Sequence, residues 1–140
     1  MIRYLTIKTE GSFDSAHKIP NTLTKCQNLH GHTWRVEIEI TGVDSPKFRM
    51  MVDFIDIKKT IDHLDHIYLN DYFKNPTAEN IARYFALKIW RIADRQYPFL
   101  LTVRARVFES PKSFAEVEAN REELHIGTIP EEVSDESNRQ

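Results

Sequence analysis

The chain has 140 residues, a formal net charge of −2 and 41% hydrophobic residues, which is typical of one globular domain with an ordinary core. The near-neutral charge and the lack of a basic cluster argue against nucleic-acid binding, and no apolar run is long enough to span a bilayer. The N-terminus lacks the charged region, apolar core and cleavage site of a signal peptide, so we expect a cytoplasmic protein that binds neither nucleic acid nor a membrane.

The first predicted element covers residues 2–17, where β-branched and aromatic residues alternate roughly with polar ones. Gly11 leaves two arrangements open, one strand or a bent pair of strands. Phe13, Ser15 and His17 have the same parity, and side chains in a strand point to the same face at every second residue. We therefore expect these three side chains to lie on one face.

Residues 18–28 are rich in Pro, Asn and Thr and predict a loop. This loop contains Cys26, the one cysteine of the chain, which cannot form an intrachain disulfide and suits a reducing compartment. A lone cysteine is commonly a small buried hydrophobe, and the alternative is a reactive thiolate.

The clearest strand of the chain covers residues 30–42. Its apolar residues alternate with charged ones, and the apolar set is Trp34, Val36, Ile38 and Ile40. His30 and His32 have the parity of Trp34, so regular pairing would direct both imidazoles to the apolar side of the sheet.

Two helices are predicted next. The first covers residues 51–69 with an imperfect apolar stripe, and residues 70–76 form a connection. The second begins after Thr77, a suitable N-cap, with Glu79 in its first turn. Its apolar face is formed by Ile81, Phe85, Ile89 and Ile92.

The last predicted elements are strands over residues 100–110 and 113–119. Glu109 has the parity of the apolar face of the first of these strands. From Asn120 onward the chain is polar and acidic, so we expect a domain over residues 1–119 and a mobile tail over residues 120–140. The order β-β-α-α-β-β predicts an α+β fold with a four-stranded antiparallel sheet and two helices on one face.

The three histidines at the ends of the first two strands predict a metal site. His30 and His32 flank a glycine and point the same way, and His17 on an antiparallel neighbour can supply a third nitrogen. Catalytic zinc commonly has three protein ligands and an open position. The alternative is that these are strand-end histidines that bind no metal.

Six blocks of the sequence carry a family resemblance. They are FDSAHKI, CQNLHGHTWRVEIEITG, MVDFIDIK, LDHIYLND, NPTAENIA and VFES, in this order. Together they cover the chain to about Glu118 and resemble the 6-pyruvoyl-tetrahydropterin synthase family. The spacing from Cys26 to the histidine pair resembles the bacterial branch, 6-carboxy-tetrahydropterin synthase, which serves queuosine and 7-deazapurine synthesis.

The resemblance implies a zinc-dependent lyase with the tunnel-forming fold, whose subunits close into a β-barrel ring, usually a hexamer built of two trimers. The implied reaction converts 7,8-dihydroneopterin triphosphate to 6-carboxy-5,6,7,8-tetrahydropterin and releases acetaldehyde and triphosphate. Three alternatives stay open: triphosphate elimination to 6-pyruvoyl-tetrahydropterin, an aldolase acting on dihydroneopterin, and a non-catalytic module that binds a pterin or a metal.

The resemblance also implies residue roles. The zinc ligands are His17, His30 and His32, and the proton-abstracting group is Cys26. Asp65 and His66 correspond to the acid–base pair. Asp62 and His63 form a rival pair, but the residues that follow, IYLN, place the family block at Asp65 and His66, and a solvated helix face accounts for His63.

Glu109 corresponds to the carboxylate that anchors the pterin ring, and its apolar parity argues against an exposed strand-end acid. Thr77 falls in a family block and either helps to form the pterin pocket or only caps the helix. Lys18 and Lys25 are candidates for triphosphate contacts or are ordinary surface lysines. Asp53 is interpreted as structural.

Overall fold

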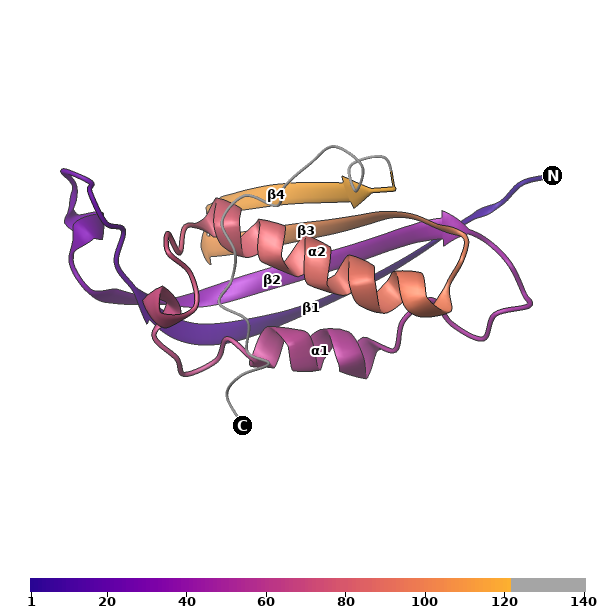
Figure 1. Cartoon of the computed structure of the whole chain (residues 1–140), viewed down its shortest axis with the longest axis horizontal. Helices are drawn as coiled ribbons and strands as arrows, with labels where there is room; N and C mark the ends of the chain where they lie inside the picture. The colour runs from indigo at the N-terminus through magenta and orange to yellow at the C-terminus, as the bar shows by residue number, and fades with distance from the viewer. Residues whose placement is uncertain (122–140) are drawn as a thin grey trace.

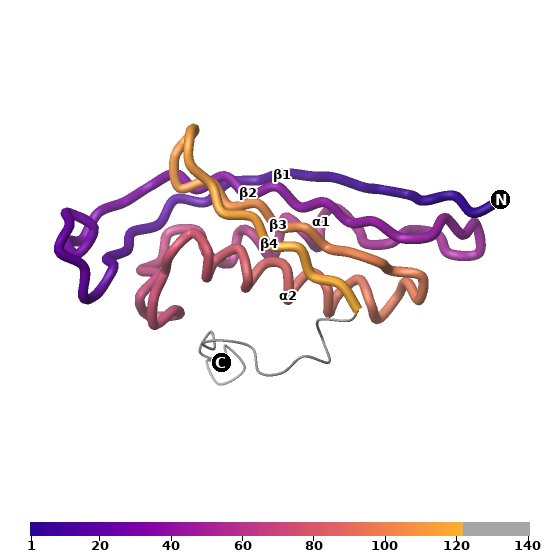
Figure 2. Tube along the Cα trace, turned by 90° about the horizontal axis from the view of Figure 1, so that it is seen from above, coloured from indigo at the N-terminus to yellow at the C-terminus, as the bar shows by residue number. Residues whose placement is uncertain are grey.

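The computed structural model describes residues 1–121, which form two layers. One layer is a four-stranded antiparallel sheet with the strand order β1-β2-β3-β4. The other layer is a pair of helices that covers one face of this sheet (Figures 1 and 2). This architecture confirms the predicted α+β pattern. Most of the predicted acidic tail, residues 122–140, lies outside the described residues.

The strands are β1 (Tyr4–His17), β2 (His30–Val43), β3 (Leu100–Ser110) and β4 (Ser113–Asn120). The helices are α1 (Phe54–Asp62) and α2 (Ala78–Gln96), with short 3-10 helices η1 (Lys25–Gln27) and η2 (Leu69–Asp71). The fourth strand includes Asn120, one residue beyond the predicted domain boundary. Within the described residues, no helix is long and apolar enough to cross a membrane.

The first strand runs without interruption through Gly11, so the single-strand alternative holds. A side chain at Gly11 would bring its Cβ to 3.2 Å from the Cδ1 atom of Ile61 on α1. The absence of a side chain therefore lets the helix pack closely on the strand at this point.

The core lies between the sheet and the helices. The alternating residues of β2 that were predicted to be apolar-facing, from Trp34 to Ile40, are fully buried and share the core with Phe85 and Ile89 of α2. Burying one such side chain stabilises the fold by roughly 1.5–3 kcal/mol. Phe13 stacks on Trp34 with ring centroids 5.8 Å apart, so the core continues to the end of the sheet where the histidines lie.

The first helix is shorter than predicted, which corrects the range 51–69. Asp53 is its N-cap, because its carboxylate accepts a hydrogen bond from the backbone N–H of Ile55 at 2.9 Å, and the interpretation of Asp53 as structural is confirmed. After Asp62 the chain leaves the helix. It then runs beside the free edge of β1, where Tyr68 forms a parallel bridge with Ala16. Tertiary pairing, which helical periodicity does not reveal, ends this helix.

Candidate metal centre

The register of β1 and β2 brings three imidazoles together. His17 lies directly opposite His30, and His32 is two residues further along β2 on the same face. The ring centroids are 4.5 Å apart for His17 and His30, 5.0 Å for His17 and His32, and 4.8 Å for His30 and His32. The structure thus brings together the three histidines that the sequence singled out.

Backbone carbonyls orient two of the rings. The Nδ1 atom of His17 lies 2.7 Å from the carbonyl oxygen of Pro76, and the Nδ1 atom of His30 lies 2.7 Å from the carbonyl oxygen of Asn28. A carbonyl oxygen only accepts hydrogen bonds, so Nδ1 carries the hydrogen in both rings. In the neutral rings, each Nε2 atom therefore presents a lone pair.

These lone pairs face each other. The Nε2 atoms of His17 and His30 are 2.9 Å apart, and neither can donate a hydrogen bond while its ring is neutral. A cation between them removes this conflict. One ligand atom each from His17, His30, His32 and Glu109 lies within 4.8 Å of the others. Imidazole nitrogens and a carboxylate are a donor set that suits a divalent transition metal.

His32 supports the same conclusion. Its Nε2 atom is buried and makes no hydrogen bond within the described residues, although a carboxylate oxygen of Glu109 lies 3.2 Å away. A buried nitrogen without a hydrogen-bond partner is costly unless another group, such as a metal, satisfies it. The residues present therefore fit a metal ion.

Burial favours the neutral form of His17 and His32. Burial is the largest influence on the pKa of His17 and lowers it, against the smaller opposing effect of the Pro76 carbonyl. Burial also lowers the pKa of His32, against the opposing charge of Glu109. Both rings are thus neutral at pH 7, which is the form that coordinates metals.

Trp34 forms the floor of the histidine cluster. Its ring lies edge-to-face with His17 and His32, at 4.9 and 5.2 Å between ring centroids. Its indole N–H donates a hydrogen bond to the carbonyl oxygen of Ser15 at 3.3 Å. The cluster therefore rests on a fully buried, rigidly packed ring.

A cavity of about 540 Å³ opens beside the cluster, lined by residues of β2 and β3 that include His32, Arg35, Phe108 and Glu109. The guanidinium of Arg35 lies over the ring of Phe108, 3.7 Å from its centroid. A Cβ atom added to Gly31 would meet only one atom within 4 Å, so the space beside Gly31 is open. A cavity of this size suits a small molecule.

Glu109 belongs to both the cluster and the cavity wall. Its carboxylate is about one-third exposed and lies against His32. The arrangement permits two roles, a fourth metal ligand or the predicted anchor for a ring with adjacent N–H donors.

Cys26 lies in η1, in the loop that connects β1 to β2 and projects beyond the end of the sheet (Figure 1). Its thiol is exposed, so the interpretation as a buried small hydrophobe is wrong. The thiol is outside the group of four clustered ligand atoms. The structure therefore keeps Cys26 free of the metal centre and accessible from solvent.

Asp65 and His66 form a hydrogen-bonded pair at the edge of β1. The Nδ1 atom of His66 lies 2.9 Å from Oδ2 of Asp65, and the His66 side chain is 79% exposed. The backbone N–H of Asp14 donates to Oδ1 of Asp65 at 2.8 Å, and this bond is the main cause of the lowered pKa of Asp65. The rival His63 lies on an exposed position as the C-cap of α1.

Three features of the site escaped the sequence reasoning. The carbonyl of Pro76 orients His17, Ser15 donates a hydrogen bond to the carbonyl of Leu64 beside the Asp65–His66 pair, and Asn70 binds the backbone of Lys18. Each contact uses a backbone group, and backbone contacts leave little signal in a sequence.

Thr77 caps α2. Its hydroxyl accepts a hydrogen bond from the backbone N–H of Asn80 at 3.2 Å, as predicted for an N-cap. A hydroxyl that accepts one bond can still donate another. The substrate-binding role of Thr77 therefore stays a prediction, as do the triphosphate contacts of Lys18 and Lys25.

The sequence matches known proteins along most of its length. A family profile described as PTPS, 6-pyruvoyl tetrahydropterin synthase, matches residues 6–120. The chain is 33% identical over 140 residues to the 6-carboxy-5,6,7,8-tetrahydropterin synthase of Haemophilus influenzae, covering 79% of this chain and 96% of that protein. It is 38% identical over 82 residues to the dihydroneopterin monophosphate aldolase of Pyrococcus furiosus, covering 56% and 68%.

Solved structures of the same architecture agree with this match. The 6-pyruvoyl tetrahydropterin synthase of Caenorhabditis elegans superposes with a TM-score of 0.66 at 25% identity, covering 85% of this chain and 98% of that one. A Plasmodium vivax 6-pyruvoyltetrahydropterin synthase superposes with a TM-score of 0.67 at 20% identity, covering 84% and 99%, and shows the likeness of fold. From its sequence match and its fold, the chain belongs to the 6-pyruvoyl tetrahydropterin synthase family.

Proposed function

We propose that this protein is a zinc-dependent lyase that converts 7,8-dihydroneopterin triphosphate to 6-carboxy-5,6,7,8-tetrahydropterin, with release of acetaldehyde and triphosphate. The observation that carries the proposal is the convergence of three imidazoles beside a small-molecule cavity. The similarity to the Haemophilus influenzae synthase over 96% of that protein supports this choice of reaction.

His17, His30 and His32 would hold the zinc ion through their Nε2 atoms. Two of these rings already direct Nδ1 to a backbone carbonyl, which fixes their orientation. A zinc ion bound there supplies a Lewis acid that polarises the hydroxyl groups of the substrate side chain. Glu109 lines the cavity and lies against His32, so its carboxylate can meet either the metal or the substrate.

Cys26 is the proposed general base. Its thiol is exposed and lies in η1, shortly before the strand that carries His30 and His32. A thiolate near a cation can accept a proton from a substrate carbon near neutral pH. Asp65 and His66 would make the complementary proton transfers, because Asp65 holds the imidazole and stabilises its charged form.

Glu109 and Thr77 are proposed to hold the pterin ring. A carboxylate accepts two hydrogen bonds from the amino group and the adjacent ring N–H of a pterin. Glu109 faces the cavity, which places its carboxylate where a ring can meet it. Thr77 directly follows Pro76, and the carbonyl oxygen of Pro76 accepts a hydrogen bond from His17. Thr77 is therefore adjacent in the sequence to a residue that contacts the metal centre.

The active protein is proposed to be a homo-oligomer, a hexamer of two trimers in which the sheets close into a β-barrel ring. The sheet ends in two edge strands, β1 and β4, and unpaired edges favour association. His66 is exposed at the β1 edge, so it can serve the cavity of a neighbouring subunit. We also propose a cytoplasmic role in 7-deazapurine synthesis for the folded domain, in which β4 extends the predicted range of residues 1–119 to Asn120.

The direct test is incubation of the purified protein with 7,8-dihydroneopterin triphosphate, followed by mass analysis of the products. We expect acetaldehyde, triphosphate and a pterin with a carboxyl group at position 6. Cys26→Ala should reduce kcat by at least about a hundredfold with unchanged zinc content. A zinc-loaded wild-type protein that leaves this substrate intact would refute the proposal.

A second candidate is an aldolase, which is favoured by the 38% identity to the Pyrococcus furiosus enzyme. The matched segment covers only 68% of that enzyme, against 96% of the Haemophilus influenzae synthase. Parallel incubation with dihydroneopterin monophosphate distinguishes the two. Retention of a three-carbon side chain after loss of triphosphate would instead indicate a 6-pyruvoyl-tetrahydropterin product.

A further inference from the structure

The side-chain amide of Asn70 forms a pair of hydrogen bonds with the backbone of Lys18. Its Oδ1 atom accepts from the N–H of Lys18 at 2.9 Å, and its Nδ2 atom donates to the carbonyl oxygen of Lys18 at 2.8 Å. Both polar ends of one side chain are therefore used on a single residue, 52 positions away in the sequence.

Lys18 occupies a special position in the chain. It directly follows His17, the last residue of β1, and begins the loop that carries Cys26. The carbonyl that accepts from Asn70 belongs to the same planar peptide unit as the N–H of Ile19. That N–H donates to the carbonyl oxygen of Cys26 at 2.7 Å. One peptide unit thus connects Asn70 to Cys26, and each bond in such a chain strengthens the other.

Asn70 itself is firmly anchored. It lies in η2 next to Leu69, which is fully buried, and η2 follows the bridge between Tyr68 and Ala16. The same segment carries Asp65 and His66 a few residues earlier. Asn70 therefore extends from a fixed part of the core to the point where β1 ends and the Cys26 loop starts.

We propose that Asn70 is a positioning residue that holds Cys26 in a defined place relative to His17. The expected effect on catalysis rests on the proposed function of Cys26. The restraint of the loop by Asn70, which we call the Asn70 latch, rests only on the hydrogen bonds described above. Without the Asn70 amide, the loop keeps the bond from Ile19 to Cys26 but loses the connection of that peptide unit to the core. The thiol then samples a wider range of positions relative to His17.

Two variants separate the two bonds. Asn70→Ala removes both of them. Asn70→Asp keeps an acceptor for the Lys18 N–H but faces the Lys18 carbonyl with an oxygen that cannot donate. Gln96→Ala is the matched control, because it truncates an exposed amide at the end of α2, away from the loop.

The measurement is hydrogen exchange resolved to single amides on the full-length, zinc-loaded protein. We expect exchange at Lys18 and Ile19 to be about tenfold faster or more in Asn70→Ala, while core amides of β2 are unchanged. In Asn70→Asp the Lys18 amide should stay protected and the Ile19 amide should exchange faster. Gln96→Ala should match the wild type.

Kinetics provide the second readout. With zinc content unchanged, Asn70→Ala should lower kcat about tenfold and leave KM within about twofold, because the base and not the substrate is displaced. Wild-type exchange at both amides in Asn70→Ala, or an equal acceleration throughout the chain, would overturn the positioning role, as would wild-type kcat. If Asn70→Ala does not fold, the Asn70→Asp pattern decides.

The two proposals fail in different ways. A wild-type protein that does not turn over dihydroneopterin triphosphate defeats the proposed function, and the exchange rates still decide whether Asn70 latches the loop. If the wild type is active but the Lys18 and Ile19 amides of a folded Asn70→Ala protein exchange at the wild-type rate, only the proposed role of Asn70 is refuted.

Discussion

At the scale of single residues, the orientation of the metal-binding rings depends on distant backbone. His17 is held by the carbonyl of Pro76, which directly precedes the N-cap of α2, and His30 by the carbonyl of Asn28 at the end of the Cys26 loop. These bonds select the tautomer in which Nε2 is available to a metal. Two of the three rings are therefore held in the tautomer that a metal requires.

The first prediction concerns zinc content. His30→Ala removes one of three nitrogen ligands, and we expect the purified protein to contain less than about a tenth of the wild-type zinc, since a lost ligand lowers affinity strongly. Inductively coupled plasma mass spectrometry of dialysed protein measures it. His63→Ala is the matched control, because this exposed histidine lies outside the cluster and should leave zinc stoichiometric.

Cobalt substitution gives a second, spectroscopic check of the same residues. Removing zinc with a chelator and adding Co²⁺ should produce the visible absorption of a low-coordinate site with nitrogen ligands. The His30→Ala protein should lack this spectrum. A wild-type protein with only the spectrum of aqueous cobalt would show that the three imidazoles do not act together.

At the scale of elements, alternation in sequence was enough to predict the sheet. Trp34 and its alternating neighbours in β2 fixed the inward face, and with it the direction of His30 and His32. The end of α1 was not predictable in the same way. The segment after Asp62 keeps a partly helical pattern, but pairing with β1 and the left-handed conformation of His66, with φ of 56°, draw it out of the helix.

The exposed thiol of Cys26 illustrates the same limit. A sequence indicates that a loop exists, but burial of a loop residue depends on how the loop packs, and here the short helix η1 presents no buried residue. The residues that follow, IYLN, favour Asp65 and His66 over Asp62 and His63 as the family pair. Nδ1 of His66 lies 2.9 Å from Oδ2 of Asp65, and the catalytic roles of both residues stay predictions.

The second prediction concerns the start of α2. Thr77→Ala removes the acceptor for the Asn80 N–H and should lower the free energy of unfolding by about 1 kcal/mol. Thr77→Ser keeps a capping oxygen and should stay within a few tenths of the wild type. Urea unfolding of both variants at one protein and zinc concentration measures the difference. Equal stability of all three proteins would show that the cap is without energetic effect.

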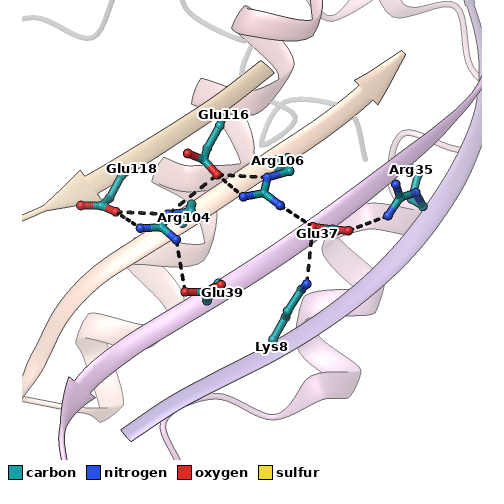
Figure 3. Close-up of polar contacts among 8 residues, drawn as sticks. All are labelled: Lys8, Arg35, Glu37, Glu39, Arg104, Arg106, Glu116 and Glu118. Atoms are coloured by element: carbon teal, nitrogen blue, oxygen red, sulfur yellow. Dashed lines mark hydrogen bonds and ion pairs between the residues drawn. The ribbon is translucent and has the colours of Figure 1, made fainter. Parts of the chain in front are cut away.

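At the scale of the whole molecule, the outer face of the sheet contrasts with the helix-covered face. It carries a ladder of cross-strand ion pairs that connects all four strands (Figure 3). The members of this charged ladder are Lys8, Arg35, Glu37, Glu39, Arg104, Arg106, Glu116 and Glu118. The central residue is Glu37, whose carboxylate meets Arg35 at 2.5 Å, Arg106 at 3.2 Å and Lys8 at 3.6 Å.

The third prediction tests this ladder. Glu37→Gln should lower the free energy of unfolding by about 1 kcal/mol, since charge-assisted hydrogen bonds from partly buried groups are lost. The effect should shrink at high salt. Glu10→Gln is the matched control, because Glu10 is largely exposed and its contact with Arg35 is long, at 3.6 Å. This substitution should change the free energy of unfolding by no more than about 0.5 kcal/mol.

The fourth prediction concerns pH. Burial tends to raise the pKa of Glu37, but the hydrogen bond from Arg35 and the charges of Lys8, Arg35 and Arg106 together lower it below its ordinary value of 4.5. A carboxylate with a lowered folded-state pKa stabilises the fold above its unfolded-state pKa. This stabilisation should therefore be constant above about pH 5 and disappear as the pH falls below 4.5.

The comparison that measures it is the difference in unfolding free energy between the wild type and Glu37→Gln from pH 7 to pH 3. The difference should become smaller as the pH falls, because protonation of Glu37 in the wild type removes the same negative charge that the substitution removes in the variant. A constant difference across this range would contradict the assignment of the stabilisation to the ionised carboxylate.

Crystals of the protein, grown without added metal and measured on both sides of the zinc absorption edge, test the central claim most directly. The account predicts one strong anomalous peak per subunit, with the Nε2 atoms of His17, His30 and His32 at about 2.0–2.1 Å from it. An anomalous map with no peak among these three nitrogens, from protein shown to be folded, would contradict the account.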